Sequence, residues 1–161
     1  MERVKASGNQ TTQREGVDRV STHSVRIHYT KEVPDEVRAI FSPLLTRWGF
    51  LVPTWCHSID IHWDDQDDSG ALRVGTHYEY READIYVLAN FLTTPENREQ
   101  QVVHELMHLS LAPLTKVAES LRDALVKKAP DVEEWANEQF RQGEEATVCD
   151  LTALVMERIA V

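Results

Sequence analysis

The sequence predicts an α+β protein in which a small, twisted and mostly antiparallel sheet packs against a layer of helices. Two observations predict this class. Alternating apolar residues, the period of a half-buried strand, recur between residues 25 and 88, and apolar residues at helical spacing dominate from residue 95 onward. A chain of 161 residues, 42% of them hydrophobic, suits one compact domain with a single core and a cleft.

The first elements follow from local patterns. Residues 25–29 are predicted to form a strand, and residues 34–48 a helix whose apolar residues, including a core Trp48, recur at helical spacing. Residues 57–63 alternate apolar and polar side chains, which predicts another strand. The acidic stretch 64–68 lacks the twelve-residue pattern and terminal glutamate of an EF-hand, so it is predicted to be a solvated loop and not a calcium site.

A β-hairpin is predicted next, from strands at residues 71–80 and 83–88 joined by a tight turn near Arg81 and Glu82. This hairpin leads directly into a helix. Pro95 suits its first position.

Three further helices are predicted after that one, which Pro113 is expected to end. Residues 115–127 and 130–141 have amphipathic patterns, and a last helix is expected to open after Gly143. The chain shows no internal repeat and no second domain.

Residues 1–19 are polar and of mixed charge, which predicts a flexible N-terminal arm ahead of one folded domain at 20–161. The arm has no apolar signal core, and no stretch approaches the length of a membrane span. Cys56 and Cys149 lie far apart in dissimilar patterns, as expected for reduced thiols. We therefore expect a cytoplasmic protein that binds no membrane. A net charge of -10 without a basic stripe predicts no nucleic-acid binding, and no pattern specifies an oligomeric state.

The helix that begins near Pro95 contains the run His104-Glu105-Leu106-Met107-His108. One helical turn separates residues i and i+4, so both histidines can face a single metal ion, with Glu105 beside the attacking water. This spacing predicts a zinc-dependent hydrolase in which Glu105 acts as general base. The competing interpretation is an ordinary helix with two hydrogen-bonded core histidines.

A catalytic zinc needs a third protein ligand, and no histidine follows His108. Metzincins carry glycine and histidine where this chain has Leu111 and Leu114, so a downstream carboxylate is the leading choice. Glu144 and Glu145 both fall on the edges of the last helix's apolar face, and periodicity does not choose between them. Whichever does not bind metal is expected to complement the dipole at that helix's N-terminus. Cys149 is a further possible ligand, although a lone cysteine in a helix is more often a small buried residue.

The region from about residue 83 to 160 resembles the gluzincin branch of the zincin metallopeptidases, in which a glutamate from a later helix completes the H-E-x-x-H site. In that family a small residue often follows the ligand, as Ala146 follows Glu145, so the resemblance assigns the third ligand to Glu145. It implies a single-domain zincin-like peptidase that binds one Zn²⁺ through His104, His108 and Glu145. Cys149 occupies the place of the acid that supports a zinc histidine in thermolysin-like enzymes, which leaves that support unassigned.

The resemblance also implies that the substrate is a protein or peptide, paired as an extended strand with the strand beside the active-site helix, here residues 84–89; the alternative is that these residues form an ordinary sheet strand. His62, His77, Tyr78 and Tyr80 are candidates to line the cleft. The alternative function is a non-catalytic zincin-like binding or regulatory module, with a structural or vestigial metal site. An intact Glu105 favours the enzyme, because a purely structural zinc site has no use for it.

Overall fold

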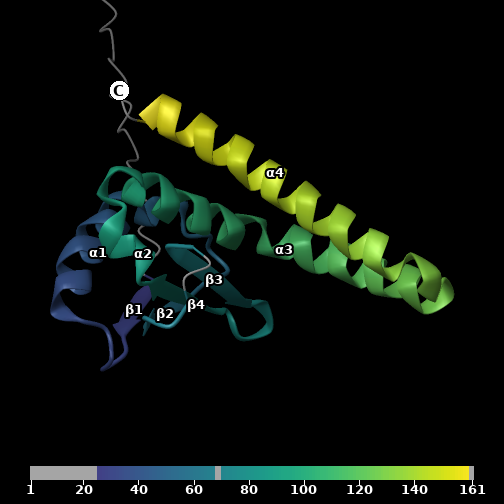
Figure 1. Cartoon of the computed structure of the whole chain (residues 1–161), viewed down its shortest axis with the longest axis horizontal. Helices are drawn as coiled ribbons and strands as arrows, with labels where there is room; N and C mark the ends of the chain where they lie inside the picture. The colour runs from purple at the N-terminus through teal and green to yellow at the C-terminus, as the bar shows by residue number, and fades with distance from the viewer. Residues whose placement is uncertain (1–24, 68–69, 160–161) are drawn as a thin grey trace, which may run out of the picture.

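The computed structural model describes residues 25–67 and 70–159 and has the predicted α+β class (Figure 1). The strands are β1 (Arg26–Tyr29), β2 (Ser58–Asp64), β3 (Leu72–His77) and β4 (Glu82–Leu88). The helices are α1 (Asp35–Trp48), the short α2 (Asn90–Thr93), α3 (Arg98–Lys128) and α4 (Glu133–Ile159). Single 3₁₀ turns are η1 (Gly49–Leu51), η2 (Tyr78–Tyr80), η3 (Pro95–Asn97) and η4 (Pro130–Val132). The predicted N-terminal arm, residues 1–19, lies outside the described residues.

The sheet formed by the described strands is mixed and has the order β1-β2-β4-β3. β1 and β4 both pair with β2 in parallel, and only the β3–β4 pair is antiparallel. The expectation of a mostly antiparallel sheet is therefore wrong. β3 and β4 form the predicted hairpin, but β4 also pairs along its whole length with β2, which places β4 inside the sheet and β3 at its edge. Alternation in a sequence predicts a strand and its buried face, but it does not say which strands become neighbours.

The hairpin turns at the predicted position. η2 ends at Arg81, whose φ of 61° lies in the left-handed region. The Arg81 N–H donates to the Tyr78 carbonyl (3.2 Å), and the Arg81 carbonyl accepts a hydrogen bond from the His57 N–H (2.7 Å). These bonds tie the turn to the start of β2 and offset the conformational cost of a left-handed non-glycine residue.

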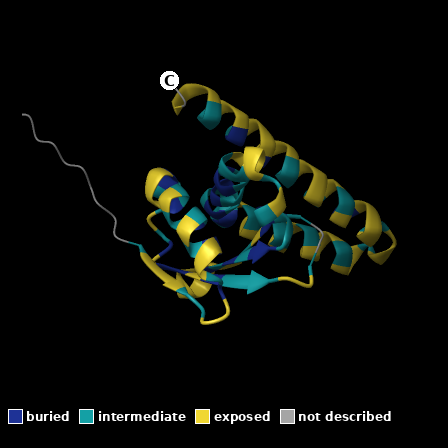
Figure 2. Cartoon of the chain, turned by 60° about the vertical axis from the view of Figure 1, so that its left-hand side comes forward, coloured by how far each residue is buried: buried dark blue, intermediate teal, exposed yellow. Residues whose placement is uncertain are grey.

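The hydrophobic core lies between one face of the sheet, α1 and the first half of α3 (Figure 2). Ile59, Ile61 and Ile85 are buried on that face, whereas the alternating Asp60 and His62 lie on the opposite face. The helices contribute buried Val37, Phe41, Leu45, Trp48, Val102, Val103, Leu106 and Leu109. This packing fixes the first half of α3 against the sheet, which is what positions the histidines.

The predicted helix end at Pro113 is wrong, because α3 runs on to Lys128. Proline has no N–H to donate to the carbonyl four residues before it, here that of Leu109. In this structure the indole Nε1 of Trp55 donates to the Leu109 carbonyl instead (3.1 Å). The carbonyl that the proline would leave without a partner is therefore satisfied from another part of the chain, and the helix continues.

The last two predicted helices form a single helix in the structure. α4 continues through Gly143, so residues 130–141 and the segment after Gly143 belong to a single helix apart from the η4 turn. A mid-helix glycine costs about 1 kcal/mol relative to alanine, which packing of α4 along α3 outweighs here. α3 and α4 lie antiparallel, and the end of this helical hairpin projects beyond the sheet (Figure 1). Among the described residues, no helix combines the length and the hydropathy needed to cross a bilayer.

Candidate metal centre

His104 and His108 lie one turn apart on the first half of α3, as the motif predicts. Their ring centroids are 5.0 Å apart and the rings meet edge to face. The side chains are 25% and 14% exposed, so both rings line the surface of a cleft rather than the core. The cleft has a volume of about 330 Å³ and is bounded by β3, α3 and α4.

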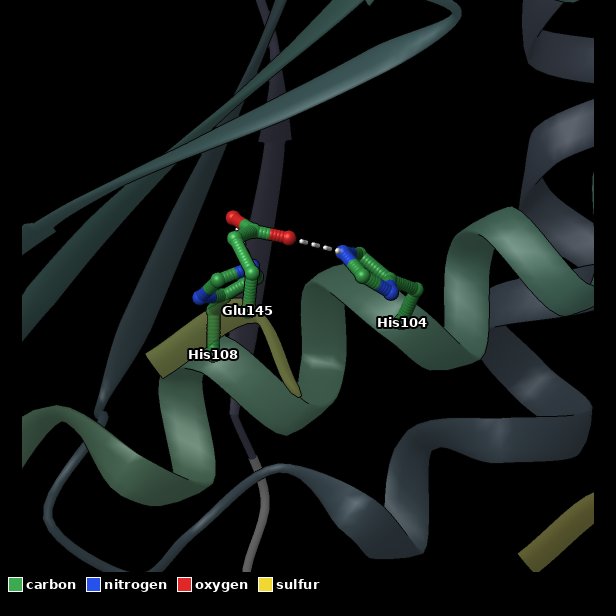
Figure 3. A group of neighbouring side chains, drawn as sticks. All are labelled: His104, His108 and Glu145. Atoms are coloured by element: carbon green, nitrogen blue, oxygen red, sulfur yellow. Dashed lines mark ion pairs between the residues drawn. The ribbon is translucent and has the colours of Figure 1, made fainter. Parts of the chain in front are cut away.

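Glu145 reaches this pair from α4 (Figure 3). One carboxylate oxygen lies 3.5 Å from His104 Nε2, and the other lies 3.5 Å from His108 Nε2. The three ligand atoms that these residues offer all lie within 4.8 Å of one another. Ligands of a tetrahedral zinc with bonds of about 2.0–2.1 Å stand about 3.3–3.5 Å apart. The donor set and its spacing therefore fit a zinc ion with little movement of the side chains.

Glu144 also borders the cleft, but it contacts His108 through Nδ1 and not through Nε2. Its Oε1 is 3.3 Å from His108 Nδ1 and accepts a hydrogen bond from Thr115 Oγ1 (3.2 Å). A carboxylate on Nδ1 fixes the ring orientation and leaves Nε2 available as a metal ligand. Glu144 therefore contacts the ring nitrogen of His108 that Glu145 does not approach. The expected role at a helix N-terminus is wrong, because Glu144 and Glu145 are in the middle of α4.

Glu105 is half-buried beside the two histidines and lines the same cleft, and its partial burial raises its pKa to about 7. Electrostatic interaction with His108 opposes this rise, Glu145 adds to it, and a hydrogen bond from the Val74 backbone N–H lowers the pKa. A carboxyl group with a pKa near neutrality can both accept and return a proton under ordinary conditions. Val74 is a contact that no sequence pattern signalled, because it depends on β3 lying at the sheet edge.

The pKa of His104 is lowered, first by burial and then by the charge of His108, while Glu145 opposes the shift. The neutral imidazole is consequently favoured. Metal binding requires this deprotonated form, so the environment of His104 suits a ligand.

The other proposed cleft residues lie elsewhere. His62 and His77 are on the open face of the sheet, where their Nε2 atoms contact opposite oxygens of Asp84 at 3.0 and 2.8 Å. Burial pushes the Asp84 pKa up, but the hydrogen bonds to His77 and His62 outweigh it and lower the pKa. Tyr78 borders a groove under the second half of α3, and Tyr80 is exposed at the turn. Neither these residues nor the exposed Cys149 belongs to the His104 cluster.

The strand expected to pair with substrate also changes. β4, which contains most of residues 84–89, is flanked on both sides by β2 and β3 and has no free edge. Within the described residues, β3 is the strand that borders the cleft, and it pairs with β4 alone. In an antiparallel pair alternate residues direct their main-chain groups away from the partner, and the Val74 N–H is directed towards Glu105 in this way.

Comparison of the chain with protein-family models, with curated proteins and with solved structures found no significant match.

Proposed function

We propose that this chain is a zinc-dependent metallopeptidase with a minimal zincin-like fold. The observation that carries the proposal is the half-buried Glu105 beside a cluster of two histidines and one glutamate at ligand spacing. His104, His108 and Glu145 are the zinc ligands, and Glu144 orients His108. Three protein ligands leave a fourth position open to the cleft, which is the arrangement of a catalytic rather than a structural zinc.

The proposed reaction is hydrolysis of a peptide bond by water. When bound, zinc supplies a Lewis acid that polarises the scissile carbonyl and lowers the pKa of a coordinated water towards about 7. Glu105 accepts a proton from the attacking water and passes it to the leaving amine, which its pKa of about 7 permits. The Val74 N–H keeps the Glu105 carboxylate oriented towards the cleft.

The proposed substrate is an extended polypeptide that pairs with the edge of β3 that no described strand covers. This edge runs beside the cleft formed by Leu72, Val74 and the metal-site residues. Strand addition gives main-chain hydrogen bonds to any sequence, so it binds the peptide backbone and leaves side-chain selection to the surroundings. The wild-type protein is therefore expected to cleave unfolded segments and not compact domains.

Metal content of the purified full-length chain tests the ligand set. Wild type should bind one zinc per chain by mass spectrometry, and Glu145→Ala should lose it. Glu144→Ala should retain zinc with lower affinity, and the exposed Glu157→Ala, on the same helix, serves as the matched control. Full zinc occupancy in Glu145→Ala would remove Glu145 from the ligand set, and no zinc uptake by the wild type would refute the metal site.

Activity is tested on a mixture of unstructured peptides, with the products identified by mass spectrometry. Glu105→Gln should bind zinc as the wild type does but release no products. Zinc binding without cleavage by the wild type would favour the alternative, a zincin-like binding or regulatory module.

A further inference from the structure

The second half of α3 carries a stripe of exposed apolar residues: Leu114, Val117, Leu121 and Leu125 are 69%, 59%, 67% and 44% exposed. At 100° per residue these four lie within about 80° of the helix circumference. They continue the side on which Leu106 is buried against the sheet. The face that packs on the core in the first half of α3 is therefore exposed to solvent in the second half, which projects beyond the sheet (Figure 1). We call these four residues the α3 stripe.

A groove of about 640 Å³ lies at the start of the stripe. Tyr78 forms one wall, and the other is formed by α3 residues that include Pro113, Leu114, Val117 and Leu121. The groove is open and mostly apolar, so the exposed stripe and the groove form one continuous surface under the projecting hairpin. Contiguous apolar patches of this kind on a soluble protein commonly mark an interaction site.

We propose that a second copy of this chain covers the α3 stripe, with the two α3 helices antiparallel about a twofold axis. The spacing of the stripe is self-complementary. Consider an antiparallel alignment in which Leu114 lies opposite Leu125 of the second copy. Val117 then lies within one residue of the position opposite Leu121 of that copy. The twofold axis generates the same two pairs a second time. The 3- and 4-residue spacings are those with which helices pack side chains between one another.

Charge complementarity supports the same alignment. It carries the end of α3, with the exposed Lys127 and Lys128, to the groove of the second copy. Glu79 follows the groove residue Tyr78: its side chain is 64% exposed and lies 4.0 Å from Lys116, which lines the groove. Among the described residues, neither terminal lysine forms an ion pair within its own chain. In the paired form the end of each α3, with its two lysines, lies near Glu79 of the other copy.

The exposed apolar area is also close to the size that a specific dimer interface needs. The stripe and Tyr78 expose on the order of 400–500 Å² of apolar surface per chain, which is within the range of the largest patches on monomers. Two such patches in contact approach the total of about 1,000 Å² expected of a specific interface. A dimer of moderate affinity is the expected form.

Sedimentation of the full-length protein over a range of concentrations tests the proposal. Wild type should show a reversible monomer–dimer equilibrium in the micromolar range. Leu121→Asp should weaken the dimer about 100-fold or more, because it places a carboxylate at the centre of an apolar contact. Leu154→Asp, an exposed leucine on α4 and outside the stripe, is the matched control and should dimerise as the wild type does. Circular dichroism confirms that each variant keeps its helices.

A charge exchange tests the antiparallel register. Lys127→Glu combined with Lys128→Glu should weaken the dimer at low salt, and addition of Glu79→Lys to the same chain should restore it. A wild type that stays monomeric, or a Leu121→Asp variant that dimerises normally, would overturn the proposal. Failure of the charge exchange to restore the dimer would overturn the register. Each measurement is made with and without zinc, so none of these outcomes depends on peptidase activity.

Discussion

Replacement of Glu105 by glutamine in the metal-free protein tests the burial of this carboxyl group. Burial raises the Glu105 pKa to about 7 from its ordinary value of 4.5. The protonated Glu105 carboxyl group therefore contributes to the free energy of unfolding in full below about pH 4.5. This contribution is lost as the pH rises, and the loss is complete above about pH 7. At about 1.4 kcal/mol per pKa unit, the loss amounts to roughly 3 kcal/mol. Glutamine has no charge at any pH, so the variant escapes this loss.

Urea unfolding followed by circular dichroism, in the presence of a chelator, measures the effect. Glu105→Gln should exceed the wild type in free energy of unfolding by roughly 3 kcal/mol near pH 8.5 and by less than about 1 kcal/mol near pH 5. Glu157→Gln removes an exposed carboxylate from α4 and should show no such pH dependence. If the difference between Glu105→Gln and wild type is the same at both pH values, the carboxyl group is not buried as described.

Three further predictions concern the helical hairpin. A Cβ added at Gly143 meets no atom within 4 Å, so Gly143→Ala should raise the free energy of unfolding by about 0.5–1 kcal/mol in urea titrations; a destabilised variant would show that α4 needs glycine there. Trp55→Phe removes the donor to the carbonyl left by Pro113 and should cost about 1–3 kcal/mol. In a double-mutant cycle with Pro113→Ala this cost should shrink, because the restored N–H satisfies the same carbonyl, and a purely additive cycle would contradict the explanation. Glu144→Gln should weaken zinc binding about 10–100-fold in competition with a chelator, whereas unchanged affinity would remove its supporting role.

The strands and the first helix were predictable because their signals are local. Alternation marked β2 and the hairpin, and helical spacing marked α1. The ends of the long helices were not predictable in the same way. Pro113 and Gly143 ordinarily end helices, but Trp55 supplies the hydrogen bond that Pro113 removes, and packing on α3 outweighs the cost of Gly143. Both compensations come from residues distant in sequence.

The candidate site likewise has one part that the sequence predicts and one part that it does not. His104, Glu105 and His108 share one helical turn, so their proximity follows from the sequence alone. Periodicity placed Glu144 and Glu145 equally well, because two consecutive residues differ by only 100° on a helix. In the structure Glu145 contacts Nε2 of His108 and Glu144 contacts Nδ1, and that distinction depends on how α4 lies on α3.

The hairpin geometry also limits how related chains can differ in length. A single residue inserted in either helix between His108 and Glu145 would turn the following residues by 100° and shift them by about 1.5 Å, which breaks the cluster. Seven residues added to each arm complete about two turns and return each face nearly to its original direction. The length of the hairpin can therefore change only by matched steps of about two turns in both arms if His108 and Glu145 are to keep their contact.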